Sequence, residues 1–510
     1  MHRRSFLIRA AAATACTSLR GLDQSTVAAQ LTLAPHPFAP QMPLSFPGLS
    51  YEMAQLTDPK FFSPSNQDLV ALFRLLSPQG ILRIGGNTSE FCWFRANPST
   101  PQPHLHTPAG RLDANWMPHR LFAITPQAID NLAGFLRATG WRLIYGLNFG
   151  NSSPARAAQE AAYVARNVGP QLDFFQIGNE PDFYHDANNG TRPPNWDFPD
   201  YLKEWTAFAQ AIVAQVPSAR FGGPDVGASS NWITQFAAAT PPAISRRLVA
   251  ITGHYYAEGP PNDPSVTVAR LLAGNSAIAP ETRAIEILAR AHGRIYRMTE
   301  GNSCYRGGKP GLSDAFASAL WAADYMLQLA SLGCAGVNLH GGSSAFLTAG
   351  LGDHTPGIQG LPAPPAIRSG FYSPIQSEPG RPIKAMPIFY GMLLASHFAG
   401  NTFLALQGSL PAINATAYAA QAPQGSKVAI FNKDPQAAID LSLRLPATLN
   451  RATLWRLQAP TLDATQEVTL AGSQILPHAA WQPIAEPIPI KNGALGIHIP
   501  AASAALLFLT

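Results

Sequence analysis

The sequence predicts a (β/α)8 TIM barrel followed by an antiparallel β-sandwich. Short apolar runs rich in β-branched and aromatic residues recur eight times with helical stretches between them, which is typical of a parallel α/β fold. After about residue 398 the pattern changes to short alternating segments, which favour a sandwich. A chain of 510 residues accommodates one such barrel and one small accessory domain.

The barrel strands and helices follow from this alternation. The strands are expected at 44–53, 80–86, 142–150, 172–180, 219–227, 248–256, 294–302 and 334–342. Apolar residues spaced three and four apart predict helices at 67–73, 126–137, 155–167, 201–216 and 313–332. Sandwich strands are expected at 415–420, 427–432, 439–445, 452–457, 467–470 and 504–509.

Residues 1–30 are expected to be a twin-arginine export signal, which would place the protein in the periplasm or outside the cell. Arg3 and Arg4 precede Phe6, Leu7 and a weakly apolar, alanine-rich stretch. That stretch is too short to span a bilayer, and no later run reaches eighteen apolar residues, so no membrane span is expected.

The remaining chain divides into three expected parts. Residues 31–43 are expected to add a strand to the sandwich, 44–398 to form the catalytic barrel, and 399–510 to form the sandwich itself. Because no flexible linker separates the barrel from the sandwich, the two domains are expected to pack rigidly.

Charge and cysteine content exclude several classes of function. The net charge of +5 falls to +2 without the first thirty residues, and no Lys/Arg run with interleaved aromatics is present, so nucleic-acid binding is not expected. Cys92, Cys304 and Cys334 are an odd number and are expected to be free thiols. No metal or organic cofactor is expected, and nothing in the sequence indicates an oligomeric state.

Two glutamates close apolar runs three βα units apart. Glu180 ends the fourth expected strand and Glu300 lies near the end of the seventh. Alone, Glu180 is compatible with a solvated turn and Glu300 with an acid at a helix N-terminus. As a pair at one barrel mouth they predict glycoside hydrolysis with retention, which uses one carboxylic acid as proton donor and one carboxylate as nucleophile about 5 Å apart.

Other polar residues close the expected strands and therefore converge on the same mouth. An amide at Asn179 is suited to hydrogen-bond a sugar 2-hydroxyl, and Tyr255 or Tyr256 to hold the nucleophile ionised. Arg83 is expected to add a positive charge beneath the nucleophile. The remaining strand-end residues include Glu52, Asn87, Asn148, Asp225, His254, Asn302 and His340.

Four segments resemble the signature segments of glycoside hydrolase family 79, which comprises heparanases and β-glucuronidases of the retaining clan A. They are Arg83-Ile84-Gly85-Gly86-Asn87-Thr88, Gln176-Ile177-Gly178-Asn179-Glu180-Pro181-Asp182-Phe183, Gly253-His254-Tyr255-Tyr256 and Thr299-Glu300-Gly301-Asn302-Ser303-Cys304-Tyr305. The similarity runs from about Leu44 to Phe398 and agrees with a C-terminal sandwich.

The resemblance implies Glu180 as acid/base and Glu300 as nucleophile. It also implies that tyrosine hydroxyls and backbone amides hold the sugar carboxylate. The positions that match are Tyr305, Gly307, Gly308, Gly370 and Tyr372. Such groups bind an anion without a dedicated arginine. An ordinary loop aromatic packing on Pro374 is the alternative for Tyr372.

The chain departs from the family pattern at two strand ends. Glu52 stands where an aspartate often reaches the distal hydroxyls of the uronate, which leaves the preference at the sugar 4-position open. His340 stands where a tryptophan is common in the clan, and it is expected either to contact substrate or to support other side chains by hydrogen bonding.

The sequence therefore predicts a retaining exo-β-glucuronidase that releases terminal β-linked glucuronic acid. One alternative is an endo-acting, heparanase-like enzyme, which needs a cleft open at both ends; the segments 184–196 and 353–381 instead resemble pocket walls. The other is a non-catalytic carbohydrate-binding protein on a decayed barrel, which the presence of both glutamates disfavours.

Overall fold

The computed structural model describes residues 25–105, 121–185, 191–239, 241–351 and 370–510. Most of the expected export signal, residues 1–24, lies outside the described residues, as do parts of the two expected pocket walls. Within the described chain, no helix combines the length and the apolarity that crossing a membrane requires.

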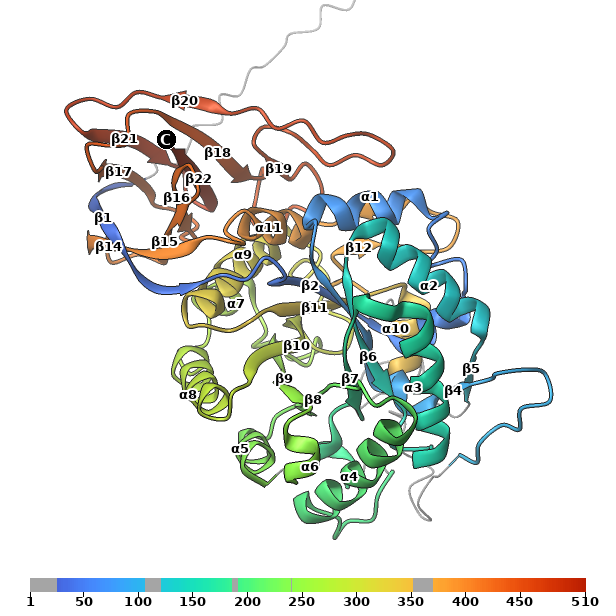
Figure 1. Ribbon diagram of the computed structural model, residues 1–510. Coiled ribbons are helices and arrows are strands. Elements are labelled where there is room, and N and C mark those ends of the chain that lie inside the picture. The colour runs from blue at the N-terminus through green and yellow to red at the C-terminus, as the bar shows by residue number, and fades with distance from the viewer. Residues whose placement is uncertain (1–24, 106–120, 186–190, 240, 352–369) are drawn as a thin grey trace, which may run out of the picture.

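Eight parallel strands form a closed barrel, which confirms the predicted fold class (Figure 1). Around the barrel each strand pairs with the next in chain order, and β11 closes the ring against β2. The strands are β2 (Pro47–Glu52), β3 (Ile81–Gly85), β6 (Arg142–Leu147), β7 (Leu172–Ile177), β8 (Phe221–Val226), β9 (Leu248–Glu258), β10 (Ile295–Cys304) and β11 (Val337–Gly341).

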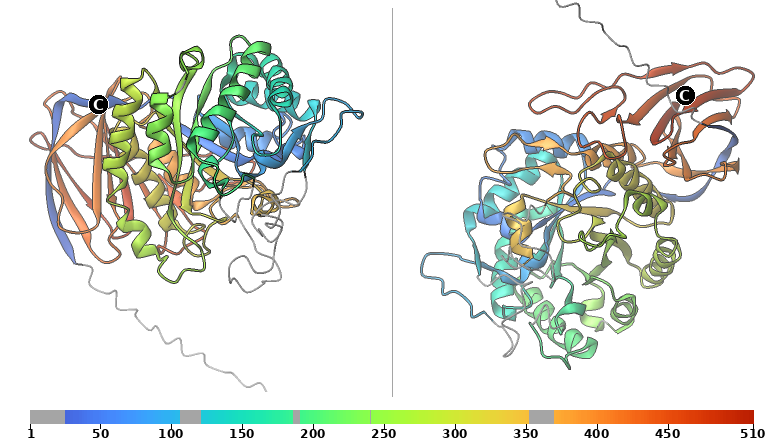
Figure 2. Two further views of the ribbon diagram at one scale, coloured as in Figure 1. Left: turned by 90° about the horizontal axis from the view of Figure 1, so that it is seen from below. Right: turned by 180° about the vertical axis from the view of Figure 1, so that it is seen from behind.

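Most helices surround this barrel on the outside, whereas the short helix that follows β11 packs against the loops at the mouth (Figures 1 and 2). The helices are α1 (Gln67–Leu76), α2 (Pro126–Thr139), α3 (Pro154–Val168), α4 (Phe198–Gln215), α5 (Ser230–Ala239), α6 (Pro242–Ser245), α7 (Val268–Ala273), α8 (Ile278–Ala291), α9 (Phe316–Ser331), α10 (Ser344–Gly350) and α11 (Pro387–Ser396). Local sequence fixes their starts: the side chains of Thr125 and Ser153 accept hydrogen bonds from first-turn amides of α2 and α3, each with proline at the first helical position.

Short elements connect the strands to the helices at the barrel mouth and elsewhere. They are η1 (Met53–Thr57), η2 (Asn87–Phe91), β4 (Cys92–Phe94), β5 (Phe122–Ile124), η3 (Gly169–Gln171), η4 (Pro181–Phe183), β12 (Ile375–Gln376) and β13 (Lys384–Ala385). Cys92, Cys304 and Cys334 are buried and unpaired, as predicted.

The barrel interior is layered. Ile81, Ile144, Phe174 and Ala250 form a small buried apolar cluster inside it. Because side chains two residues apart on a strand point to the same side, Arg83 follows Ile81 into the interior, one layer closer to the C-terminal ends of the strands. The apolar layer therefore closes the barrel below a polar layer that supports the mouth.

The C-terminal domain is built from one sheet whose strands fold around a second apolar core. All its pairings are antiparallel except that between β1 and β17. Its strands are β1 (Thr26–Gln41), β14 (Thr402–Ser409), β15 (Ala415–Ala422), β16 (Gly425–Asn432), β17 (Ala438–Arg444), β18 (Ala452–Gln458), β19 (Thr469–Leu470), β20 (Glu486–Ile488), β21 (Ala494–Ile499) and β22 (Ser503–Leu509).

The N-terminal strand β1 lies between β14 and β17 in this sheet. Its first residues, 26–30, already pair with β17, from Thr26 opposite Ala438 to Gln30 opposite Ser442. The boundary that the sequence placed at residue 30 therefore falls inside a paired strand.

Helix α9 joins the barrel to the sandwich. The amides of Phe316 and Ala317 at its start donate to the carbonyl oxygens of Ala464 and Leu462. Further along α9, the carboxylate of Asp324 accepts hydrogen bonds from Thr416 and Tyr418 and forms an ion pair with Lys433. One continuous apolar core also includes residues of both domains. These contacts hold the sandwich in a fixed position beside the barrel (Figure 2).

Removing the carboxylate of Asp324 is expected to destabilise the protein strongly. In Asp324→Ala the ammonium of Lys433, only 7% exposed, loses its charged partner. Breaking a buried pair from one side costs about 3–5 kcal/mol. Asp440→Ala is the control, because Asp440 is 62% exposed and a surface change of this kind stays within about 0.5 kcal/mol. Denaturant unfolding measures both, and equal midpoints for the two variants would contradict the anchoring role of Asp324.

Candidate active site

A cavity of about 580 Å³ opens at the C-terminal ends of the barrel strands. Ten residues singled out in the sequence line it: Glu52, Asn87, Glu180, His254, Tyr255, Tyr256, Glu300, Tyr305, His340 and Tyr372. Its lining also includes Phe183, Gly227, Ala228, Glu281, Arg306, Leu347 and Leu351. Most of these side chains belong to strand ends or to the loops that follow them, where barrel active sites are built.

Glu180 is held by an unusual backbone conformation directly after β7. Its φ of 49° and ψ of 51° lie in the left-handed region, which is uncommon for a non-glycine residue. Its amide donates to the carbonyl oxygen of Asp225 at 2.9 Å. Two residues later, Asp182 accepts hydrogen bonds from the amides of three consecutive residues, Gly227, Ala228 and Ser229. The loop after β7 is thereby fixed to the loop after β8, and the acid side chain points into the cavity.

Glu300 faces Glu180 across this cavity. A carboxylate oxygen of each residue lies within 4.8 Å of the other. Retaining glycosidases hold their two carboxyl groups about 5 Å apart, whereas inverting enzymes leave about 6.5–9.5 Å for a water molecule. The separation therefore fits direct attack by a carboxylate on the sugar.

Several positive or proton-donating groups surround Glu300. The guanidinium of Arg83 donates to Oε2, and the hydroxyl of Tyr256 donates to Oε1 at 2.8 Å. Burial alone would raise the pKa of Glu300, but the charges of His340, His254 and Arg83 outweigh it and lower this pKa to about 2. Glu300 is therefore a carboxylate at neutral pH. Of the two adjacent tyrosines it is thus Tyr256 that donates to Glu300, whereas the ring of Tyr255 stacks on Tyr325.

The pKa of Glu180 is shifted in the opposite direction. Burial raises it above its usual value, and the negative charges of Glu300 and Asp182 raise it further, against the opposing effect of a hydrogen bond from His254. Two neighbouring carboxyl groups with oppositely shifted pKa values are the arrangement in which one acts as an acid and the other as a nucleophile.

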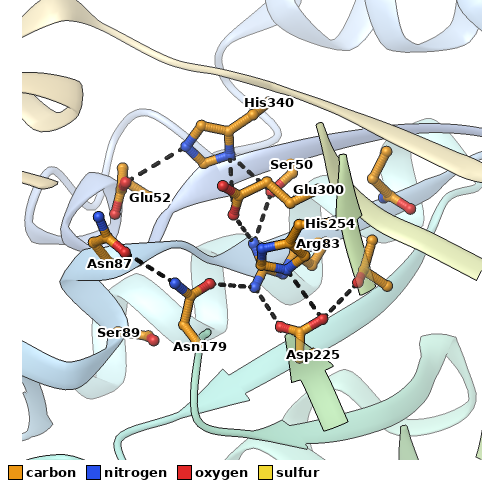
Figure 3. A network of polar contacts seen from close by, with 12 residues as sticks. Ser50, Glu52, Arg83, Asn87, Ser89, Asn179, Asp225, His254, Glu300 and His340 are labelled. Atoms are coloured by element: carbon orange, nitrogen blue, oxygen red, sulfur yellow. Dashed lines mark hydrogen bonds and ion pairs between the residues drawn. The ribbon is translucent and has the colours of Figure 1, made fainter. Parts of the chain in front are cut away.

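Arg83 is the centre of the polar layer beneath these carboxylates (Figure 3). It is 1% exposed. Its three nitrogens donate to side chains from β2, β7, β8, β10 and the loop after β7: Ser50, Gln176, Asn179, Asp225 and Glu300. Arg83 therefore does not line the cavity but supports it from below.

Asn179 and Asn87 lie side by side at the edge of this layer. The side-chain oxygen of Asn179 accepts from Arg83 at 2.7 Å, and its nitrogen donates to Asn87 at 3.0 Å. Asn179 is buried and does not line the cavity, whereas Asn87 does. Both polar atoms of the Asn179 amide thus already have a protein partner.

Glu52 and His340 come from the ends of β2 and β11 and line the cavity. Oε2 of Glu52 accepts from the amide and the hydroxyl of Thr88 at 2.8 and 2.6 Å. His340 places Nδ1 2.9 Å from the hydroxyl of Ser50 and Nε2 3.5 Å from Glu52 (Figure 3). His340 therefore both lines the cavity and supports its neighbours. Gly86, at φ 70°, makes room for Glu52, since a Cβ there would lie 2.6 Å from the Glu52 carboxylate.

The residues matched to a uronate site separate into two groups. Tyr305 and Tyr372 line the cavity beside Tyr256, with ring centroids 6.4 and 6.1 Å from it. Gly307, Gly308 and Gly370 do not appear in the lining. The amides of Gly370 and Tyr372 donate to the carbonyl oxygen of Gly307 at 3.0 and 3.4 Å, so these two amides join the loops to each other instead of facing the cavity.

Two strand-end residues to which the sequence assigned no role, Asp225 and His254, complete the site. Nδ1 of His254 lies 2.9 Å from Oε1 of Glu180, and Nε2 lies 3.1 Å from Oδ1 of Asp225, an ion-pair contact without hydrogen-bond alignment. The available signal was their position at the ends of the fifth and sixth expected strands.

Glu180, His254 and Glu300 also have the spacing of metal ligands, since one atom from each lies within 4.8 Å of the others. A histidine ligates a metal only as neutral imidazole. The carboxylates of Asp225 and Glu300 outweigh the effect of burial and raise the pKa of His254 to about 10, so its ring is an imidazolium at neutral pH. The cluster is therefore suited to acid–base chemistry.

The depressed pKa of Glu300 predicts a pH-dependent contribution to stability. Its ionised form is favoured in the folded protein, so this contribution is fully present above the unfolded pKa of about 4.5 and is lost as pH falls through about 2. Glu300→Gln removes the titrating group. The difference in unfolding free energy between the wild type and Glu300→Gln, measured by denaturant titration, should shift against the wild type between about pH 5 and pH 2. A difference that is constant across this range would contradict the shift.

Comparisons with known proteins agree with the resemblance seen in the motifs. The chain is 27% identical over 332 residues to a β-glucuronidase of Aspergillus niger, covering 61% of this chain and 59% of that protein. It is 25% identical over 304 residues to a β-glucuronidase of Neurospora crassa, covering 54% and 52%. The matches thus span less than two thirds of the length of these curated relatives. No family model matches the chain.

Solved structures share the whole fold. A 4-O-α-L-rhamnosyl-β-D-glucuronidase from Fusarium oxysporum 12S superposes with a TM-score of 0.72 at 18% identity, over 95% of this chain and 100% of that one. A family 51 arabinofuranosidase from Xanthomonas axonopodis pv. citri gives a TM-score of 0.62 at 16% identity, over 95% and 100%. Barrel and sandwich together are therefore an architecture shared with glycoside hydrolases.

Proposed function

We propose that the protein is a retaining exo-β-glucuronidase. The observation that carries this proposal is the carboxylate pair: Glu180 and Glu300 lie within 4.8 Å, face one cavity, and have pKa values shifted in opposite directions. The similarity to fungal β-glucuronidases supports glucuronic acid as the sugar.

The first chemical step forms a glycosyl-enzyme. A carboxylate oxygen of Glu300 attacks the anomeric carbon while protonated Glu180 gives its proton to the glycosidic oxygen, so the C–O bond to the leaving group breaks as the ester bond forms. Arg83 and Tyr256 keep Glu300 ionised until it attacks. In the second step ionised Glu180 takes a proton from water, the hydroxide oxygen bonds to the anomeric carbon, and Glu300 is released as a carboxylate.

The structure supports the change of role that Glu180 must make between these steps. The negative charge of Glu300 is one cause of its raised pKa. In the ester intermediate that charge is absent, so the pKa of Glu180 falls and the carboxylate form needed for the second step becomes favoured.

The choice of a uronate is supported by the cavity wall beside the nucleophile. Tyr256, Tyr305 and Tyr372 gather there, and Arg306 adds a cation to the lining. Phenol hydroxyls and a guanidinium are good donors to a sugar carboxylate. Glu52, Asn87 and His340 also line the cavity, with the ring of His340 5.9 Å from that of Tyr372, and offer groups suited to hydroxyls.

Exo action is supported by the way the cavity is closed beside Asn87 and Glu52. Asn87 donates to the carbonyl of Gly350, and a Cβ on Gly350 would meet the carboxylate of Glu52, so α10 packs tightly over that end of the cavity. A pocket blocked beyond the sugar accepts a chain end and not an internal unit. Oligosaccharide products from heparan sulfate would instead support the endo alternative.

A panel of nitrophenyl glycosides tests the proposed function. We expect the β-glucuronide to be hydrolysed with the highest kcat/KM, ahead of the β-galacturonide, and with the β-glucoside far behind because it lacks the carboxylate that the tyrosines and Arg306 bind. Preference for the glucoside would contradict the uronate assignment. Failure to hydrolyse every member would favour the non-catalytic carbohydrate-binding alternative.

Amide substitutions of the two glutamates separate their roles. Glu300→Gln is expected to lose turnover of every aryl β-glucuronide, because an amide is no nucleophile here. Glu180→Gln should lose about 10²–10⁴-fold on substrates with poor leaving groups but much less on 2,4-dinitrophenyl glucuronide, which needs no proton donor for departure. Steady-state kinetics on the two substrate classes measures this, and undiminished turnover by Glu300→Gln would refute the nucleophile assignment.

A further inference from the structure

Asp225 and His254 are buried beside the acid/base, and the two-carboxylate mechanism gives them no role. The side chain of His254 is fully buried, and that of Asp225 is 1% exposed. They form a continuous chain from the polar layer to the cavity: Arg83 donates to Asp225, Asp225 lies 3.1 Å from Nε2 of His254, and Nδ1 of His254 lies 2.9 Å from Glu180.

We infer that Asp225 and His254 form a positioning pair that keeps Oε1 of Glu180 as a hydrogen-bond acceptor and leaves Oε2 to carry the transferable proton. The inference rests on the proposed function, because it assigns which oxygen of the acid faces the glycosidic bond. Neither residue touches the reacting atoms in this scheme; both act through Glu180.

The direction of the hydrogen bond follows from the charges around the imidazole. Three carboxyl groups face His254, namely Asp225 on β8, Glu300 on β10 and Glu180 after β7, and the guanidinium of Arg83 binds the other oxygen of Asp225. Asp225 is itself kept ionised: it accepts from Arg83 at 2.7 Å and from Gln176 and Thr299 at 2.5 Å each. With a carboxylate on one side and the nucleophile nearby, both ring nitrogens of His254 remain protonated. Nδ1 can then only donate, and Oε1 of Glu180 can only accept.

This arrangement has a consequence for each chemical step. In the first step, a proton on Oε1 would place two hydrogens between Nδ1 and Oε1, so the acidic proton is confined to Oε2. In the second step, Glu180 must be a carboxylate, and the adjacent imidazolium stabilises that charge. The groups that face Glu180 are His254, Glu300 and Asp182, and His254 is the cation among them.

Arg83 links this pair to the nucleophile. It contacts both Asp225 and Glu300, so one buried guanidinium holds the base of the positioning pair and the attacking carboxylate in a common frame. The geometry therefore connects the protonation of Glu180 to the negative charge of Glu300. One chain of contacts runs from Glu180 through His254 and Asp225 to Arg83, and the other runs directly from Arg83 to Glu300.

Two substitutions of His254 separate the hydrogen bond from the charge. In His254→Asn the side-chain amide nitrogen can occupy the place of Nδ1 and donate to Oε1, but the positive charge is gone. In His254→Phe both are lost. His397→Asn, at a buried histidine between barrel and sandwich, is the control for the general cost of changing a buried ring.

We expect the pH profile of kcat/KM to report the charge. Activity falls at high pH because Glu180 loses its proton. Removing the imidazolium within hydrogen-bond distance should raise the pKa of Glu180, so the basic limb of the profile should move to higher pH by about 1–3 units in both His254 variants. The limb of His397→Asn should remain at the wild-type position.

The dependence on leaving group should report the hydrogen bond. His254→Phe should lose about 10²-fold or more on a poor leaving group such as methyl β-glucuronide while retaining most activity on 2,4-dinitrophenyl glucuronide, and His254→Asn should recover much of the difference. Equal losses on both substrates with an unmoved basic limb would show a purely structural role and overturn the inference.

A measurement without catalysis keeps this test separate from that of the proposed function. The titration of Glu180 can be followed by carbon NMR of protein labelled at glutamate carboxyls, with Glu180→Gln identifying the signal. A higher pKa of Glu180 in His254→Asn, and also in Asp225→Asn, which removes the support of the imidazolium, is the expected result. An unchanged pKa in His254→Asn would overturn the inference even if the wild type proved to be an efficient glucuronidase.

Discussion

The buried guanidinium of Arg83 is the interaction on which the rest of the site depends. Its charge lies inside the barrel at 1% exposure, where an unpaired ion would be very unfavourable. Two carboxylates, Asp225 and Glu300, balance it, and the neutral groups of Ser50, Gln176 and Asn179 use its remaining donors. Because these partners come from five different places around the barrel, Arg83 fixes their relative positions. Gly85 is part of the same constraint, since a Cβ there would lie 2.6 Å from the guanidinium.

The charges around Arg83 are arranged so that two chemically identical side chains behave differently. Cations outweigh burial at Glu300, which is ionised, whereas at Glu180 burial and the charges of Glu300 and Asp182 outweigh the effect of His254, so Glu180 retains its proton more strongly. The difference arises from the neighbours and not from the glutamates themselves. Since Glu180 and Glu300 share Arg83, His254 and Asp225 as support, substitutions among these residues should not be additive.

Much of this structure was predictable from the sequence. Six of the eight barrel strands lie within the expected ranges, and β9 and β10 run two residues beyond theirs, because a strand buried on both faces is a recognisable apolar run and its polar end marks the mouth. Asn179 beside the acid and Arg83 beneath the nucleophile were singled out for the same reason. Sequence could therefore support the predictions that depended only on the place of a residue at a strand end and on the chemical type of its side chain.

What the sequence could not supply was the partner of each polar group. Tyr255 and Tyr256 are equivalent in sequence, yet only Tyr256 is placed to donate to Glu300, because adjacent residues on β9 point to opposite sides. The resemblance suggested that the amides of Gly370 and Tyr372 bind an anion, but both donate to the carbonyl oxygen of Gly307, which lies far earlier in the chain. Asp225 and His254 gained a role only from contacts between strands, which no local pattern encodes.

The position of β1 has a consequence for how the chain is completed. This strand begins at Thr26, but its neighbours β14 and β17 extend to Arg444, so the first strand of the described chain to be synthesised is among the last to find its partners. Until then both edges of β1 are open to pairing with other chains. The barrel closes when β11 pairs with β2 and therefore needs the chain only as far as Gly341, whereas β1 needs both β14 and β17, the second of which ends at Arg444.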